Sequence, residues 1–138
     1  MKIRHVSQPD DTGCGLAVVA MITGKTYQEV KETMIDLGIF KTINEDWGTT
    51  FKDLQLTLQH YDLNTSSRRK FKKWQNIPAK VAIASTNYDK SGWFHWVVFI
   101  RDINGFFIYD PALRCKKIRD LRGKRSGHFI EINQMLIQ

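Results

Sequence analysis

The sequence has little of what marks secreted or membrane proteins. Its two cysteines, Cys14 and Cys115, are too few for a disulfide scaffold, so free thiols are expected. The longest apolar run, Leu16 to Ile22, has seven residues, whereas a helix that spans a bilayer needs about 18. The N-terminal residues contain no hydrophobic stretch of the secretory kind. We therefore expect no membrane span, and a protein that is cytoplasmic or exported without a signal peptide.

Signatures of metals and nucleotide cofactors are absent too. No C-x-x-C or H-E-x-x-H motif occurs, and His5, His60 and His128 do not have ligand spacing. The stretch Gly13–Gly15 fails as a dinucleotide fingerprint, because Val18 stands at the third glycine position and no strand is expected before it. We expect neither a metal nor a cofactor.

Proline is scarce, at three residues in 138, and there is no repeat or low-complexity linker. Hydrophobic residues make up 42% and charged residues 25%, which are ordinary values for a globular domain. We predict one domain over residues 1–138.

Positive charge is concentrated in two segments. Residues 68–73 carry five basic groups, and residues 114–125 carry seven basic groups and one acid. Because the whole chain has a net charge of +7, its remaining residues carry −4. Such segments can attract an acidic protein or nucleic acid, and they can also be plain solvated surface. Phe71 and Trp74 would be available to stack on bases.

The first half of the chain predicts helices and the second half predicts strands. Leu16 to Ile22 is apolar on every side, as in a buried helix, and Gly24 suits its end. Thr26–Glu29 fits a capping box, and Thr50–Asp53 resembles another helix start. Strands are expected at 79–84, 93–103, 106–109 and 128–132, with Asn104–Gly105 as a hairpin turn. Helices followed by antiparallel strands predict an α+β fold.

Cys14 lies between Gly13 and Gly15, where the buried helix is expected to begin. A helix N-terminus favours negative charge and therefore the thiolate. The two glycines leave room for a substrate carbonyl to approach. A small core cysteine would occupy the same position, so the position alone does not separate the two interpretations.

His95 and Asp110 lie on the two sides of the predicted hairpin turn. His95 precedes Asn104 by nine residues, and Asp110 follows Gly105 by five, an inequality that a bulge or a strand end can absorb. An acid beside a base beside a thiol is the arrangement of an activated nucleophile. Trp93 and Trp96, next to His95, are candidates for the lining of a substrate cleft and equally for the core.

Gln8 is a fourth candidate, six residues before Cys14 in a polar loop. Its side-chain amide is placed to donate to an oxyanion together with the backbone N–H of Cys14. An ordinary loop glutamine is the alternative. Four motifs then stand in order: Gln8 to Ile22, Gly48 to Leu54, His95 to Ile100 and Tyr109 to Pro111.

Together these motifs resemble the double-glycine leader peptidases, papain-like cysteine peptidases that process bacteriocins. The resemblance runs from Gln8 to about Ile132. It implies a papain-like fold with N-terminal helices packed on a C-terminal antiparallel sheet. It also implies a peptide or protein substrate, cut after Gly-Gly, although amidases and transferases use the same chemistry.

The resemblance implies a role for each candidate residue. Cys14 would be the nucleophile, His95 the general base and then the acid, and Asp110 the group that orients His95. Gln8 would help to form the oxyanion hole. The chain departs from the family at Gly13, where an acid usually precedes the cysteine, so we expect a different loop conformation there.

A second hypothesis is a papain-fold toxin or binding module that acts on nucleic acid through the basic segments 68–73 and 114–125. It predicts binding that weakens steeply with salt. A third hypothesis has these segments recruit an acidic protein substrate to the thiol site.

Overall fold

The computed structural model describes residues 3–40, 46–88, 90–113 and 117–134, so Cys115 lies outside the described residues. Three helices come first: α1 (Cys14–Thr23), α2 (Tyr27–Asp36) and α3 (Phe51–His60). The strands follow, with one 3-10 helix among them: β1 (Leu63–Thr65), β2 (Arg69–Lys70), η1 (Trp74–Asn76), β3 (Val81–Thr86), β4 (His95–Asp102), β5 (Gly105–Tyr109) and β6 (His128–Gln134). The predicted α+β class is confirmed. No helix in the described ranges is long and apolar enough to cross a bilayer.

The three helices begin and end as local chemistry dictates. Residues 14–22 of α1 are all buried, and Gly24 ends the helix at φ +74°, a left-handed conformation that suits glycine. At the start of α2, the Thr26 hydroxyl accepts from the Glu29 N–H at 3.1 Å, and the Glu29 carboxylate accepts from the Thr26 N–H at 3.3 Å. A capping box also opens α3, between Thr50 and Asp53.

The strands form one antiparallel sheet in the order β1-β6-β3-β4-β5, with β2 paired to β6. The strands predicted at 79–84 and 93–103 lie at 81–86 and 95–102. Three elements were not predicted: β1, β2 and η1. Each has only two or three residues, which is too short for a periodic pattern to reveal.

The turn between β4 and β5 differs from the prediction by one residue. Asp102 pairs with Gly105, so the turn residues are Ile103 and Asn104. The Asp102 carboxylate accepts from the Asn104 N–H at 2.9 Å, which stabilises the turn at this position. Gly105 takes φ +118° as the first residue of β5.

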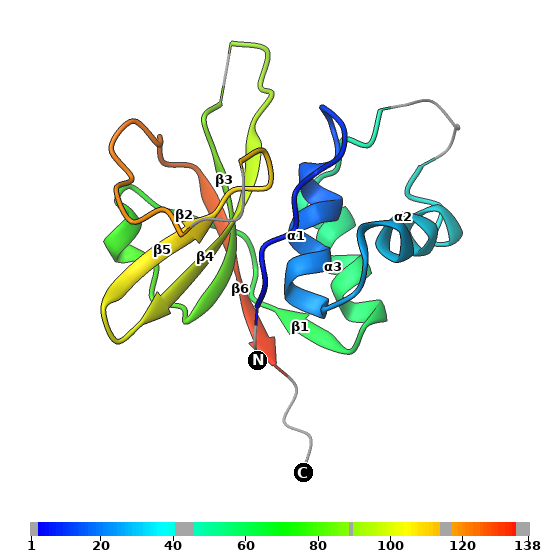
Figure 1. Ribbon diagram of the computed structural model, residues 1–138, viewed down its shortest axis with the longest axis horizontal. Helices are drawn as coiled ribbons and strands as arrows, with labels where there is room; N and C mark the ends of the chain where they lie inside the picture. The colour runs from blue at the N-terminus through cyan, green and yellow to red at the C-terminus, as the bar shows by residue number, and fades with distance from the viewer. Residues whose placement is uncertain (1–2, 41–45, 89, 114–116, 135–138) are drawn as a thin grey trace.

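Two hydrophobic clusters cover the two faces of the sheet. The helices cover one face, and Figure 1 shows α1 next to the sheet with α2 farther out. The other face packs against the chain between β2 and β3 and against Leu121. Phe71 and Trp74 are only 3% and 7% exposed in that second cluster. The expectation that they are available for base stacking is therefore wrong, because both complete the core.

Candidate active site

Cys14 is the first residue of α1, and its side chain is buried. No side chain caps this helix, since Gly13 at the N-cap contributes no side-chain hydrogen bond. The partial positive charge of the helix end is thus directed at the thiol. Cys14 is the free cysteine of the described residues.

Gly15 allows α1 to approach the loop before α3. A Cβ at Gly15 would lie only 2.1 Å from the Thr49 hydroxyl oxygen. That hydroxyl also accepts from the Trp96 indole N–H at 3.1 Å, so α1, the loop and β4 meet at one point. Gly15 is therefore required for packing, and its predicted contact with substrate stays a prediction.

His95 and Asp110 are brought together by the end of the β4–β5 pairing. His95 is the first residue of β4, and Asp110 directly follows β5, whose last residue Tyr109 pairs with Val98. Asp110 lies beyond the paired residues, so the strand end absorbs the unequal distances from the turn. The His95 Nε2 donates to Asp110 Oδ1 at 2.5 Å.

His95 and Asp110 each hold the charged form of the other. Burial lowers the pKa of His95, but hydrogen bonds and charge interactions with Asp110 and Cys14 outweigh this and raise it to about 9. Burial raises the pKa of Asp110, but His95, the Ala112 N–H and Lys124 lower it to about 2. His95 thus interacts with both the Cys14 thiol and the Asp110 carboxylate, and at neutral pH His95 and Asp110 form an ion pair.

Hydrogen bonds to both its carboxylate and its carbonyl hold Asp110, whose side chain is 3% exposed. Besides His95, the backbone N–H of Ala112 donates to Oδ1 at 2.9 Å, and Lys124 Nζ donates to Oδ2 at 3.2 Å. The His5 ring donates from Nε2 to the Asp110 carbonyl at 2.8 Å. Neither Lys124 nor His5 was predicted, because no local motif connects them to Asp110.

Gln8 joins the cysteine loop to the turn that follows Asp110. Its backbone N–H donates to the Pro111 carbonyl at 2.9 Å, and its side-chain Nε2 donates to the Asp10 carbonyl at 2.7 Å. Among the described residues, its Oε1 is a buried polar atom without a hydrogen-bond partner. One of the two amide hydrogens is thereby used within the loop, and the predicted oxyanion role rests on the other.

Asp10 explains why glycine stands where an acid was expected. Its Oδ1 accepts from the N–H groups of Gly13 at 2.6 Å and Thr12 at 3.2 Å, and its Oδ2 accepts from the Tyr27 hydroxyl at 2.6 Å. A Cβ at Gly13 would lie 2.0 Å from that hydroxyl. The carboxylate of this loop therefore belongs to Asp10, three residues before Gly13. The Tyr27 hydroxyl fills the space that a side chain at Gly13 would need. Burial and the Asp10 contact raise the pKa of Tyr27 well above its usual value.

A small cavity of about 60 Å³ lies beside Cys14. Its walls come from the cysteine loop, the loop before α3 and the start of β4: Thr12, Cys14, Gly48, Thr49, Gly92, Trp93, Phe94 and Trp96. Trp96 is buried and belongs to the core as well, whereas Trp93 is 49% exposed. Gly13 is absent from these walls. The substrate contacts of all four predicted residues, Gly13, Gly15, Trp93 and Trp96, stay predictions.

The described residues contain no group of three metal-ligating side chains. A buried thiol at a helix start, in contact with a histidine–aspartate pair on a sheet, is typical of cysteine peptidases. The chain belongs to the Peptidase C39 family, whose sequence model matches residues 2–126. Membership implies cysteine peptidase activity on a peptide substrate. No curated protein matches the chain.

Proposed function

We propose that the protein is a cysteine peptidase in which Cys14 is the nucleophile, His95 the general base and then acid, and Asp110 the group that orients His95. The observation that carries the proposal is the chain of contacts from Cys14 through His95 to Asp110, with 2.5 Å between His95 Nε2 and Asp110 Oδ1. Because Asp110 engages Nε2, the other ring nitrogen, Nδ1, is left to face the thiol.

The reaction follows from these positions. Cys14 Sγ adds to the carbonyl carbon of the scissile amide, and the electron pair of the C=O bond moves to the oxygen, which the Cys14 N–H and the Gln8 amide stabilise. His95 gives its proton to the amine, the C–N bond breaks, and a thioester remains. His95 then takes a proton from a water molecule, whose oxygen adds to the thioester. The C–S bond then breaks. This releases the carboxylic acid product and leaves Cys14 Sγ as the thiolate beside protonated His95.

The cavity beside Cys14 supports cleavage after small residues such as Gly-Gly. Two of its walls are glycines, Gly48 and Gly92. Trp93 closes over the first of them, since its ring lies 3.5 Å from the position of a Cβ at Gly48. A cavity of about 60 Å³ bounded in this way favours substrate residues without long side chains.

The proposal is tested by the rate of Cys14 alkylation with iodoacetamide as a function of pH, in a Cys115→Ser background. A thiolate stabilised by His95 reacts well below pH 8.5, near which a free thiol titrates. We expect such reaction in the parent protein and its loss in His95→Ala. An ordinary thiol profile that His95→Ala leaves unchanged contradicts the proposal. Peptides with Gly-Gly, Ala-Ala and Leu-Leu before the scissile bond then test the preference for small residues.

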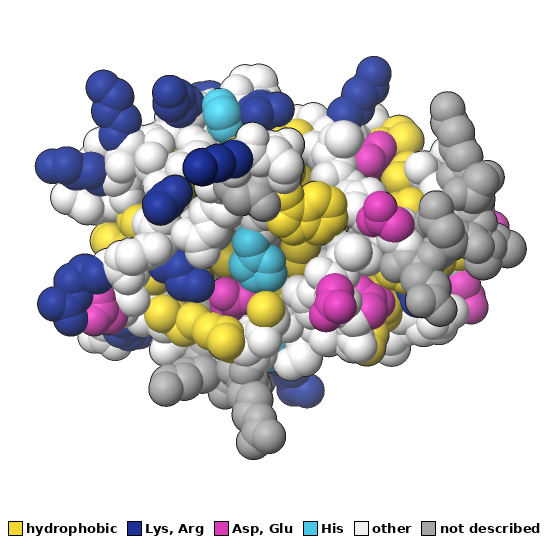
Figure 2. Space-filling view, turned by 90° about the horizontal axis from the view of Figure 1, so that it is seen from above, with side chains coloured by type: hydrophobic (Ala, Val, Ile, Leu, Met, Phe, Trp, Pro, Cys, Tyr) yellow, Lys and Arg dark blue, Asp and Glu magenta, His cyan; other side chains and the backbone are white. Residues whose placement is uncertain are grey.

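The alternative of a nucleic-acid module loses its aromatic platform, because Phe71 and Trp74 are buried. Recruitment of an acidic polypeptide is favoured instead by the position of the basic segments. The two segments lie together: Lys70 pairs with His128, and the Trp74 indole donates to the Lys124 carbonyl at 3.0 Å. Figure 2 shows the face of the molecule that is seen from above in Figure 1. On this face, Lys and Arg gather mainly over the sheet side, and Asp and Glu mainly over the helix side.

This basic surface adjoins the candidate site. The Thr86 hydroxyl donates to the Arg125 carbonyl, and Thr86 is the β3 residue that pairs with His95. Lys70, Lys72, Lys73 and Arg125 are exposed there. We therefore propose that acidic side chains of the polypeptide substrate bind this surface while the scissile bond lies at Cys14.

A further inference from the structure

The Asp110 carboxylate contacts two cations rather than one. His95 donates to Oδ1, and Lys124 Nζ lies 3.2 Å from Oδ2. The Lys124 side chain is 22% exposed, whereas the other described basic residues of its segment are exposed: Lys117, Arg119, Arg122 and Arg125. A buried carboxylate is costly unless its charge is balanced, so this contact differs in kind from a surface ion pair.

Among the described residues, Lys124 balances the charge that Cys14, His95 and Asp110 leave over. In the reactive form, Cys14 carries a negative charge and His95 a positive charge, which cancel each other. The buried Asp110 then contributes a second negative charge, and the Lys124 ammonium group is the second cation in contact with its carboxylate, after His95. The row of thiolate, imidazolium, carboxylate and ammonium is neutral as a whole, which lowers the cost of burying it.

The backbone holds Lys124 in place. The Trp74 indole N–H donates to its carbonyl at 3.0 Å, and its own N–H donates to the Leu121 carbonyl at 3.0 Å. The next residue, Arg125, donates its N–H to the Asn87 side chain at 3.2 Å. Lys124 therefore reaches Asp110 from an anchored position.

We propose that Lys124 is a positioning residue of the thiol site, whose ammonium group balances the second oxygen of Asp110 and thereby limits the hold of Asp110 on the His95 proton. The inference rests on the proposed function. Without Lys124, the carboxylate would be opposed by the imidazolium alone. His95 would then keep its proton to higher pH, and the more negative site would disfavour the thiolate.

In the described part of the chain, the titratable groups that face this row come from distinct elements. Cys14 of α1 faces His95, and Tyr27 of α2 lies on the far side of Cys14, bonded to Asp10. The His5 ring faces the backbone carbonyl of Asp110. Cys14, Tyr27 and His5 place no positive charge against the Asp110 carboxylate. They therefore cannot replace the charge that a substitution at Lys124 removes.

The test is the pH profile of Cys14 alkylation in Lys124→Met and Lys124→Gln, in the Cys115→Ser background and well below the melting temperature of each variant. We expect the low-pH limb, where the thiolate forms, and the high-pH step, where His95 loses its proton, both to move upward by roughly one pH unit. Lys124→Arg keeps the charge and restores the parent profile. Two charge-removing variants are used because breaking a buried ion pair can unfold a protein.

Two controls separate this effect from general charge. Lys80→Met removes the same charge from an exposed residue outside the basic segments and leaves the profile in place. In an Asp110→Asn background, Lys124→Met has little further effect, because the two residues act through one another. Suppose that the parent profile is shifted. The inference alone is overturned if Lys124→Met and Lys124→Gln leave this profile unchanged, or if Lys80→Met moves it equally. An ordinary thiol profile in the parent overturns the proposed function as well.

Discussion

Cys14 and His95, which face each other in the candidate site, are positioned in different ways. The cysteine loop is held by neutral and singly charged hydrogen bonds that are mostly local, such as those from Gly13 and Thr12 to Asp10. The histidine is held by a buried ion pair whose acid comes from 15 residues away. That acid is held in turn by Lys124, a further 14 residues along the chain.

This difference indicates that the cysteine loop and the His95–Asp110 pair respond to different changes: the loop to changes of shape, and the pair to changes of protonation. Hydrogen bonds within a short loop depend mainly on the shape of the loop, and the backbone N–H groups that donate them do not titrate. A chain of charged groups depends on the protonation of every member. We therefore expect changes at Asp110 to alter rates and pH dependence, and changes at Gly13 to alter stability.

The largest effect is expected for Asp110→Asn. The amide keeps the shape of the side chain but removes the charge that orients His95 and stabilises its cation. Loss of the equivalent charge in other triads lowers the rate by up to about 10⁴-fold, and we expect a loss of roughly 10²- to 10⁴-fold here. The measurement is kcat on a Gly-Gly peptide, with Asp120→Asn as a control at an exposed acid. Equal rates for Asp110→Asn and the parent would show that His95 works without it.

The same variant has a signature in stability against pH. The pKa of Asp110 is lowered to about 2, so its ion pairs stabilise the fold above pH 4 and are lost as the pH falls toward 2. The shift from the ordinary value near 3.8 corresponds to about 2.5 kcal/mol. The raised pKa of His95, about 9, works in the other direction: its stabilisation is complete below pH 6.5 and is lost through pH 9. Denaturant unfolding of Asp110→Asn should lose most of both slopes.

Local chemistry explains why part of the molecule is predictable from the sequence. Gly24, the capping box at Thr26 and the helix start at Thr50 act within a few residues, so the helix positions follow from them. Cys14 at the start of α1 is predictable for the same reason. The pairing of His95 with Asp110 needed only the hairpin and the family resemblance.

The remaining features depend on tertiary contacts that leave no periodic signal. β2 exists because β6 pairs with it, and the basic residues around Phe71 conceal its place in the core. Lys124 reaches Asp110 through an irregular segment that returns across the sheet. The Tyr27 hydroxyl excludes a side chain at Gly13. These two residues are 14 positions apart, and no sequence motif connects them.

A medium effect is expected in the cysteine loop. Gly13→Ala places a Cβ 2.0 Å from the Tyr27 hydroxyl and 2.6 Å from Asp10 Oδ1, so the loop must shift. We expect a loss of roughly 1–3 kcal/mol of unfolding free energy. Tyr27→Phe removes the hydroxyl and its bond to Asp10, at a cost of about 1–2 kcal/mol. The double variant should lose less than the sum, because the phenyl ring leaves more room for the Cβ.

Urea unfolding of the four proteins measures this coupling. Unlike Asp110→Asn, none of these variants removes a charged group from the His95–Asp110 pair, so the loss of stability toward pH 9 that His95 causes should be the same in all four proteins. Strict additivity of the two losses would mean that Tyr27 does not set the conformation at Gly13. A change in that loss would mean that the cysteine loop is coupled to the His95–Asp110 pair.

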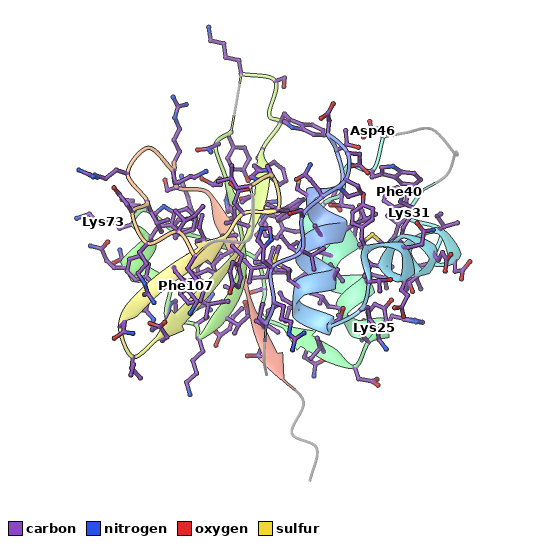
Figure 3. All side chains as sticks on the ribbon, in the orientation of Figure 1. Lys25, Lys31, Phe40, Asp46, Lys73 and Phe107 are labelled. Atoms are coloured by element: carbon purple, nitrogen blue, oxygen red, sulfur yellow. The ribbon has the colours of Figure 1, made fainter. Side chains whose placement is uncertain are left out.

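The smallest effect is expected at the basic surface, where charges are exposed and screened. Lys72→Glu/Lys73→Glu reverses two exposed charges without touching the groups around Cys14, and Figure 3 shows Lys73 at the outer edge of the sheet side. For a Gly-Gly peptide with acidic flanking residues, we expect KM to rise roughly three- to tenfold at low salt with kcat unchanged, because exposed charges act on encounter.

The matched control is Lys25→Glu/Lys80→Glu, which makes the same change in net charge at exposed positions elsewhere. Figure 3 places Lys25 on the helix side, and Lys80 directly precedes β3, at the end opposite Thr86. At high salt the KM values of both double variants and the parent should converge, since screening shortens the reach of surface charge to a few ångströms. If the control raises KM as much as the reversal beside the site does, net charge alone attracts the substrate. If KM for the acidic peptide stays the same in both, the basic surface has no part in recognition, and the site binds its substrate through the cavity at Cys14.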